Sequence, residues 1–167
     1  MPDTSRTRRI TAATLIATAI AVPAEGLRRV AYYDPPGILT VCMGHTGRDV
    51  VAGKVYSLAE CDALLTDDMR KAVAIVEKCQ PDLPENVLAA FADAVFNLGP
   101  TIACNLTEST AARKLRARDF AGACAEFPKW DKARKMGFLV PLPGLTKRRE
   151  LERRVCLGTG DSLGAIG

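Results

Sequence analysis

The sequence predicts an α+β fold in which a small β-hairpin lobe and a mainly helical lobe are joined by a long helix. Residues 38–43 are rich in strand-forming side chains and are bounded by glycines. Between residues 57 and 79, apolar side chains recur every three or four positions, which is the period of a helix with one buried face. Further helical patterns continue to residue 157, so helices dominate the second half of the chain.

The composition indicates one globular domain. The chain has 167 residues, of which 48% are hydrophobic and 25% are charged. The formal net charge is only +4. The basic residues of segments 113–118 and 147–154 alternate with apolar residues at helical spacing, which is typical of solvated helix faces. We therefore expect no nucleic-acid partner.

The long helix and its successor have clear boundary signals. Ser57 and Glu60 form the pattern of a capping box, and Pro81 ends the helix that follows. The next helix is predicted to begin at Pro84 and to stop at Gly99. Both helices carry an apolar stripe, so both should border the core.

The remaining helices are predicted to be shorter. Thr107 and Asp119 are expected to cap two of them, and Thr146 is expected to cap a last helix that runs to Leu157. We divide the chain into an N-terminal segment (1–24), a main domain (25–157) and a C-terminal tail (158–167).

The N-terminal segment has the layout of an export signal or a signal anchor. Arg6, Arg8 and Arg9 precede residues 10–24, which carry no charge. As a helix this run would extend about 22 Å, which is shorter than the roughly 30 Å hydrocarbon core of a bilayer. Two outcomes stay open: cleavage after Ala24, which satisfies the small-residue rule, or retention as a weakly held anchor.

Residues 25–46 contain two acids, Glu25 and Asp34, together with Thr40 and the only histidine of the chain, His45. Two carboxylates at a fixed separation can cleave a glycosidic bond, because one protonates the leaving oxygen while the other acts at the sugar carbon or on water. The spacing alone is a weak signal.

The residue pattern of this stretch is a more specific signal. Glu-Gly-x-Arg from Glu25, Ala-Tyr-x-Asp ending at Asp34, and Gly-x-x-Thr-x-x-x-Gly-His-Thr from Gly37 resemble the start of the phage-type lysozymes, the muramidase family of viral endolysins. The resemblance covers residues 25–157. It implies a lysozyme-like fold and hydrolysis of the β-1,4 bond between N-acetylmuramic acid and N-acetylglucosamine in peptidoglycan, without a metal or cofactor. The modest positive charge suits a polyanionic cell wall.

The resemblance also implies roles for single residues. Glu25 matches the catalytic acid, Asp34 the second carboxylate, and Thr40 the threonine that positions water. As the acid, Glu25 must carry a proton, and we expect Arg28 or Arg149 to oppose this if either lies beside it. Asn97 matches a substrate-binding position. His45 is expected to be structural and to pair with Asp68.

Six cysteines together with an export-like segment favour disulfides over buried thiols. No Cys-x-x-Cys is present, and one histidine cannot complete a common zinc site. Fifteen connectivities are possible for six cysteines. Among them we predict Cys42–Cys61, between hairpin and helix, Cys79–Cys104, around the central helix, and Cys124–Cys156, between the last helix and the core.

The N-terminus is also similar to the uncleaved signal-arrest-release segments of some phage lysozymes. This implies an inner-membrane form facing the periplasm, release into the periplasm, dependence on a holin, and a monomeric enzyme. Because Glu25 follows the apolar run without a linker, we expect the tethered form to be inactive. No cysteine precedes Cys42, so control by disulfide exchange is not supported.

Three alternatives remain open. A secreted lysozyme would lose the N-terminal segment as a signal peptide. A lytic transglycosylase needs one acid, and Asp34 and Thr40 argue against it. A non-catalytic wall-binding protein could keep the same fold.

Overall fold

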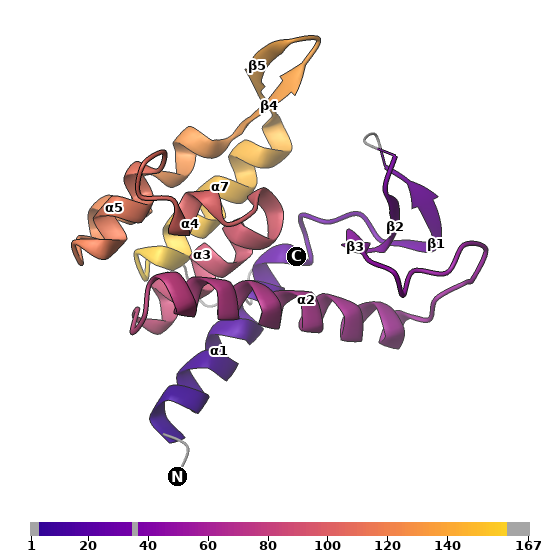
Figure 1. Ribbon diagram of the computed structural model, residues 1–167, viewed down its shortest axis with the longest axis horizontal. Helices are drawn as coiled ribbons and strands as arrows, with labels where there is room; N and C mark the ends of the chain where they lie inside the picture. Colours follow the sequence, from indigo (N-terminus) through magenta and orange to yellow (C-terminus); the bar gives the residue numbers. More distant parts are fainter. Residues whose placement is uncertain (1–3, 35–36, 160–167) are drawn as a thin grey trace.

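A small sheet and a bundle of helices lie at the two ends of the long helix α2 (Leu58–Cys79) in the computed structural model, which describes residues 4–34 and 37–159 (Figure 1). The helical lobe contains α1 (Thr4–Ala21), α3 (Glu85–Leu98), α4 (Thr101–Cys104), α5 (Thr110–Arg116), α6 (Phe120–Cys124), the 3-10 helix η1 (Phe127–Trp130) and α7 (Pro143–Cys156). The predicted arrangement of two lobes and a connecting helix is confirmed.

The small lobe is built on an antiparallel sheet of three strands, β1 (Arg28–Tyr33), β2 (Leu39–Cys42) and β3 (His45–Thr46). Thr40 pairs with Tyr32 on one side and with Thr46 on the other. Gly44 has a φ of +83°, which allows the sharp turn between β2 and β3. The sheet brings the two ends of the 25–46 stretch together.

The predicted capping box opens α2. The Ser57 hydroxyl accepts a hydrogen bond from the Glu60 amide, and the Glu60 carboxylate accepts one from the Ser57 amide. The helix ends before Pro81, as predicted, and its buried residues include Leu65, Met69 and Val76.

The centre of the helical lobe is α3, whose residues from Val87 to Val95 are all buried. Helices α1, α2 and α7 pack around it. Phe91 contacts Phe127 of η1 with ring centroids 4.7 Å apart. A helix buried on all sides can place a polar side chain deep in the protein only when that side chain is paired, and Asp93 is such a residue.

Residues 4–21 of the N-terminal segment form α1, and one face of this helix is part of the core. Ala13, Ala17 and Ile20 are fully buried. The buried carboxylate of Glu77 on α2 contacts Arg9 at 2.8 Å and Arg6 at 3.5 Å, so charge pairing supplements the apolar contact. Among the described residues, no helix combines the length and apolar character that a membrane crossing requires.

Two predicted helix caps are wrong. Ser109, not Thr107, caps α5, because the Asn105 side chain takes the amides of Thr107 and Glu108 in a preceding turn. Helix α7 begins at Pro143, so Thr146 lies inside it and its hydroxyl donates to Asp131. Asp119 caps α6 as predicted. Residues 160–167 of the tail lie outside the described residues.

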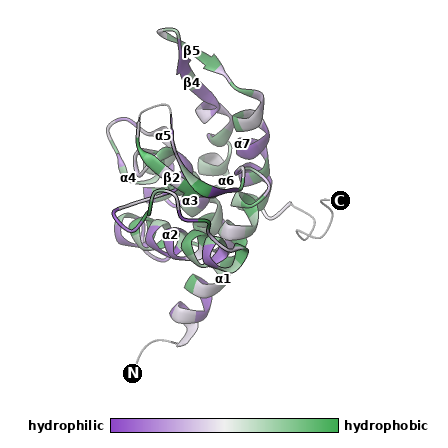
Figure 2. Cartoon of the chain, turned by 90° about the vertical axis from the view of Figure 1, so that its right-hand side faces the viewer, coloured by the Kyte–Doolittle hydropathy of each residue, from purple (hydrophilic) through white to green (hydrophobic). Residues whose placement is uncertain are grey.

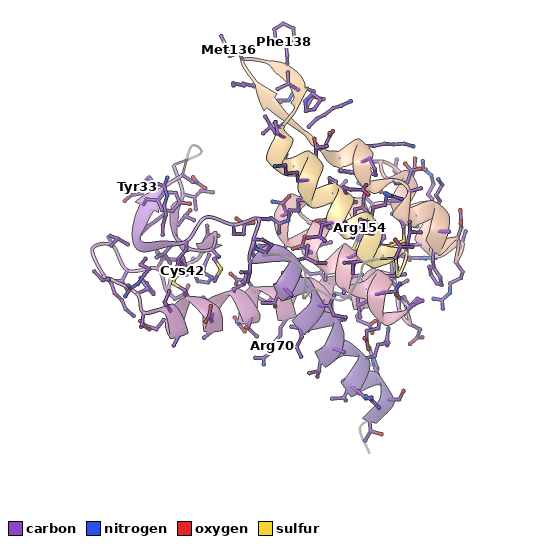
Figure 3. The ribbon with its side chains drawn as sticks, turned by 180° about the vertical axis from the view of Figure 1, so that it is seen from behind. Tyr33, Cys42, Arg70, Met136, Phe138 and Arg154 are labelled. Atoms are coloured by element: carbon purple, nitrogen blue, oxygen red, sulfur yellow. A yellow bond between two sulfur atoms is a disulfide. The ribbon has the colours of Figure 1, made fainter. Side chains whose placement is uncertain are left out.

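A second hairpin was not predicted. Strands β4 (Lys132–Lys135) and β5 (Phe138–Pro141) pair antiparallel and project from the helical lobe. Figure 2 shows β4 as hydrophilic and β5 as hydrophobic. Met136 and Phe138 lie at the outer end of the hairpin in Figure 3.

All three predicted disulfides are present. Cys42–Cys61 joins β2 to α2, Cys79–Cys104 joins the end of α2 to α4, and Cys124–Cys156 joins α6 to α7. One disulfide therefore attaches the small lobe to α2, and the other two cross-link elements of the helical lobe.

Candidate active site

Glu25 lies where the two lobes meet. Its amide donates to the carbonyl of Ala21 at 3.0 Å, so its backbone is fixed to the end of α1. One carboxylate oxygen, Oε1, accepts a hydrogen bond from Arg148 of α7 at 2.5 Å. The other faces the small lobe, because a Cβ placed on Gly44 would lie 3.5 Å from Oε2. The side chain keeps 21% of its exposure, so solvent and substrate can reach it.

Arg148 is the partner of Glu25 that the sequence analysis missed. Its side chain is only 3% exposed, and it also donates two hydrogen bonds to the fully buried carboxylate of Asp93, at 3.0 and 2.8 Å. Burial alone would lower the pKa of Arg148. The hydrogen bonds to Asp93 and Glu25 and the attraction of their charges outweigh the effect of burial and raise this pKa. Arg148 is therefore a permanent cation that orients Glu25.

Arg149, one of the two cations considered as possible neighbours of Glu25, makes other contacts. It is fully buried and donates to Glu152 and, at 3.0 Å, to the side-chain oxygen of Asn97. The expected substrate-binding residue Asn97 is thus partly occupied by an internal contact. Arg28, the other candidate, is exposed and stacks over the Tyr32 ring.

The buried cluster around Glu25 has an uneven charge balance. Arg148 and Arg149 supply two positive charges. Glu25, Asp93 and Glu152 would supply three negative charges if all were ionised, so the cluster is neutral when one carboxyl holds a proton. Burial, assisted by Asp93 and opposed by the two arginines, raises the pKa of Glu152 well above its ordinary value.

Asp34 and Thr40 are both hydrogen-bonded to the backbone of Ile38. The Ile38 amide donates to Asp34 Oδ1 at 2.7 Å, and the Ile38 carbonyl accepts from the Asp34 amide at 3.0 Å and from the Thr40 hydroxyl at 3.0 Å. Asp34 is partly buried, whereas Thr40 is only 3% exposed. The Ile38 backbone therefore holds both side chains.

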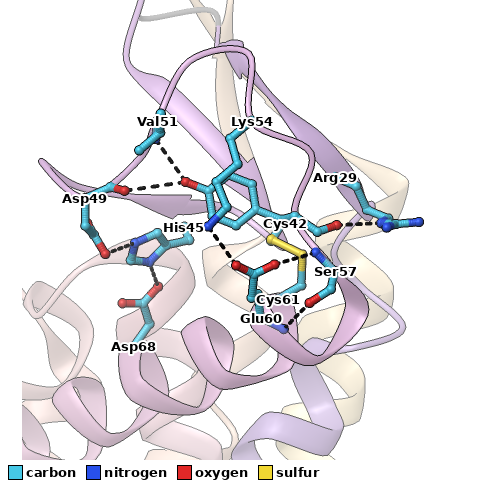
Figure 4. The surroundings of a disulfide bond; sticks show 11 residues. Arg29, Cys42, His45, Asp49, Val51, Lys54, Ser57, Glu60, Cys61 and Asp68 are labelled. Carbon is cyan, nitrogen blue, oxygen red and sulfur yellow. Dashed lines mark hydrogen bonds and ion pairs between the residues drawn. A yellow bond between two sulfur atoms is a disulfide. The ribbon is translucent and has the colours of Figure 1, made fainter.

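His45 is buried beside the sheet and pairs with Asp68 of α2, as predicted. The distance from His45 Nδ1 to Asp68 is 2.6 Å, and Nε2 lies 3.1 Å from Asp49 (Figure 4). This contact and the nearby Cys42–Cys61 disulfide both fix the sheet to α2. No group of three or more acidic, histidine or cysteine side chains among the described residues is arranged to hold a metal ion.

A pocket of about 280 Å³ opens between the end of α1 and α7, within the helical lobe, and neither Glu25 nor Asp34 is part of its lining. Ala24, Lys147 and Arg148 form part of its lining. The arrangement offers an acid beside a cation, and a second carboxylate that accepts a hydrogen bond from the Ile38 amide. This is suited to acid-assisted cleavage of a polar substrate between the lobes.

The phage lysozyme family model matches residues 23–152. The chain belongs to the phage lysozyme family. The matched range contains Glu25, Asp34, Thr40 and Arg148, and it begins after the end of α1. The family resemblance of the sequence is thereby confirmed, and the chain is a lysozyme-type hydrolase that takes part in cell-wall lysis.

Similar proteins support the same assignment. The SAR-endolysin of Bacteriophage PS119 is 40% identical over 137 residues, which cover 80% of this chain and 76% of that protein. The SAR-endolysin of Enterobacteria phage P21 is 37% identical over 134 residues, covering 80% and 77%.

Two solved structures show the same fold. The active form of the P1 phage endolysin Lyz has a TM-score of 0.71 at 25% identity, covering 86% of this chain and 83% of that one. A P22 lysozyme mutant has a TM-score of 0.68 at 28% identity, covering 84% and 94%. The fold of this phage lysozyme is therefore the lysozyme-like endolysin fold that the sequence predicts.

Proposed function

We propose that this phage lysozyme hydrolyses the β-1,4 bond between N-acetylmuramic acid and N-acetylglucosamine of peptidoglycan. The observation that carries the proposal is the Glu25 carboxyl group, which is oriented by Arg148 at the junction of the lobes and is still reachable by solvent. Asp34 and Thr40, fixed through Ile38, supply the second half of the reaction from the facing lobe.

In this reaction Glu25 gives its proton to the glycosidic oxygen as the bond between that oxygen and the muramic acid carbon breaks. Asp34 removes a proton from a water molecule, and the water oxygen bonds to the positively charged sugar carbon. The Thr40 hydroxyl donates to Ile38 and can still accept a hydrogen bond from that water. Arg148 stabilises the carboxylate that Glu25 becomes.

The test combines Glu25→Gln and Asp34→Asn with analysis of the products. Both variants should lose nearly all wall-degrading activity, while Glu85→Gln, an exposed change on α3, should not. Mass analysis of the muropeptides should give reducing muramic acid ends. Anhydro ends would indicate a transglycosylase, and full wall degradation by Glu25→Gln would refute the assignment.

The stereochemical outcome depends on how water attacks. We propose inversion, with Asp34 as the base, and proton NMR of the freshly released anomer tests it. Thr40→Ser should keep more activity than Thr40→Val, because only serine retains the hydroxyl. A retained anomer would assign Asp34 as a nucleophile instead.

We further propose that activity is controlled by release of residues 10–24 from the inner membrane into the periplasm. Support comes from the position of α1: Ala13, Ala17 and Ile20 are buried in the helical lobe, and the Glu25 amide is bonded to Ala21. If α1 lay in lipid, it could not pack beside α3, and Glu25 could not reach Arg148. A holin that depolarises the membrane would supply the trigger, and the released enzyme would act as a monomer.

Fractionation of cells before and after membrane depolarisation tests this control. The protein should move from membrane to periplasm at unchanged mass, and wall degradation should begin at that time. Loss of residues 1–24 would indicate a cleaved signal peptide. A membrane-bound form that digests the wall at full rate would contradict geometric control.

A further inference from the structure

The β4–β5 hairpin exposes apolar side chains at its tip. Met136 is 92% exposed, Phe138 is 75% exposed and Leu139 is 62% exposed. Met136 and Gly137 have φ angles of +51° and +86°, which makes a tight turn that holds these side chains outward. Adjacent apolar side chains on a projecting element usually mark a surface that contacts something else.

The same hairpin is strongly basic. Lys132, Arg134 and Lys135 are exposed on β4, and in the described part of the chain none of them forms an ion pair. The sequence contains no acidic residue from Lys132 to Arg149. The tip is therefore apolar, and the strand behind it presents three exposed cations, while the carboxylate of Asp131 at the base of the hairpin accepts a hydrogen bond from Thr146.

We propose that the β4–β5 hairpin binds the surface of a bilayer that contains anionic phospholipids. The apolar tip would enter the boundary between headgroups and acyl chains, and the cations of β4 would contact lipid phosphates. The apolar tip is complementary to the acyl chains, and the flanking cations are complementary to the anionic headgroups.

A glycan is a poorer match for this hairpin. Sugar sites pair an aromatic face with carboxylate or amide groups that bind hydroxyls, and residues 132–142 contain no Asp, Glu, Asn or Gln. The hairpin and the N-terminal end of α1 lie at opposite ends of the helical lobe in Figure 1. The proposed contact is therefore separate from the N-terminal segment.

Cosedimentation of the full chain with vesicles tests the proposal. Vesicles of phosphatidylcholine with and without phosphatidylglycerol are compared at low and high salt. Two variants are used: M136S with F138S, and K132Q with R134Q and K135Q. The charge variant should bind anionic vesicles on the order of a hundredfold more weakly, and the apolar variant should lose binding at both salt concentrations.

Matched controls change exposed residues elsewhere. Val55→Ser with Leu58→Ser removes two exposed apolar side chains, one beside the small sheet and one at the start of α2, and R70Q, K78Q and R154Q together remove three exposed cations. These variants should bind vesicles as the parent does. All of them keep α1, so any binding through α1 is common to the whole series.

A second measurement reports insertion directly. Phe138→Trp should be quenched by brominated lipid more strongly than Val55→Trp. Equal quenching, or vesicle binding unchanged in both hairpin variants, would overturn the proposal. Loss of binding to purified cell-wall sacculi with unchanged vesicle binding would also overturn it, because the hairpin would then be a wall-binding surface.

Discussion

Arg148 of α7 donates a hydrogen bond to Glu25 across 123 residues of sequence, and Asp93 of α3 holds the same guanidinium from within the core. The candidate acid is thus positioned by a cation that the centre of the helical lobe keeps in place. A substitution of Arg148 that keeps its positive charge should therefore alter catalysis more than it alters folding.

Arg148→Lys is expected to lower kcat by about 10²-fold with little change in KM, because lysine keeps the charge but cannot bind Glu25 and Asp93 together. The pH profile of kcat should also shift, which a purely structural role would not produce. Steady-state kinetics on soluble peptidoglycan fragments measures both. Arg154→Lys, an exposed change on the same helix, is the control.

Arg148→Ala should instead destabilise the fold by about 3–5 kcal/mol, since Asp93 would be left buried and unpaired. Unchanged kcat and pH profile in a folded Arg148→Lys enzyme would show that the contact is not needed for the reaction.

The sequence allowed the local part of this site to be predicted, but not its distant part. Glu25, Asp34 and Thr40 lie within residues 25–46, and the residue pattern there that resembles the phage-type lysozymes, more than the spacing, indicates a common site. Arg148 comes from a far helix, and in the run Lys147-Arg148-Arg149 only tertiary packing decides which cation faces Glu25. The nearest sequence signal was the spacing of Arg148 and Glu152, which lie one turn apart on α7.

Two helix caps were predicted wrongly and the second hairpin was not predicted, and the physical reasons are again local. Thr107 and Ser109 are both good caps, and the Asn105 side chain decided between them by binding the Thr107 amide. The β4–β5 turn uses Met136 and Gly137 in place of the Asn-Gly pair that usually marks such a turn. Its exposed apolar strand also lacks the alternation of a half-buried strand.

Arg9→Gln should weaken the attachment of α1. Glu77 is 5% exposed on its side chain and contacts Arg9, which also donates to the carbonyl of Leu83 at 2.5 Å. Loss of this partly buried pair should cost about 2 kcal/mol. Amide hydrogen exchange in α1 should then be about 30-fold faster.

Arg8→Gln is the matched control, because Arg8 is exposed on the same helix. Equal protection of α1 in both variants would indicate that apolar packing alone holds the segment. If the proposed membrane control is right, Arg9→Gln should also delay the onset of wall degradation after depolarisation.

Removal of the Cys42–Cys61 disulfide should affect both stability and activity. Its partners are 19 residues apart, so replacement by serines should cost about 3 kcal/mol. Cys42 lies two residues after Thr40, and loosening of this strand should lower kcat about tenfold. Urea denaturation and kinetics below the unfolding temperature measure the two effects.

Replacement of Cys79 and Cys104 provides the comparison. These partners are 25 residues apart and lie at the other end of α2, so the loss should again be about 3 kcal/mol but kcat should be unchanged. Equal losses of kcat in the two double variants would contradict a specific link between Cys42 and the site.

Glu126 should contribute to the acid sensitivity of the fold. Burial alone would raise the pKa of Glu126, but hydrogen bonds from Lys114 at 2.7 Å and Lys129 at 2.8 Å outweigh it and hold the pKa below its ordinary value. A carboxyl group whose pKa is lower in the folded state stabilises that state above its unfolded pKa. The contribution is lost as the pH falls through the folded pKa.

Glu126→Gln should therefore be less stable than the parent by about 1.5 kcal/mol at pH 7, and the difference should shrink below about pH 4. Urea denaturation from pH 3 to 7 measures the free energy of unfolding at each pH, with the exposed change Glu108→Gln as the control. A difference that stays constant over this range would mean that Glu126 acts through packing, because a charge-based contribution must disappear once the carboxylate is protonated in both states.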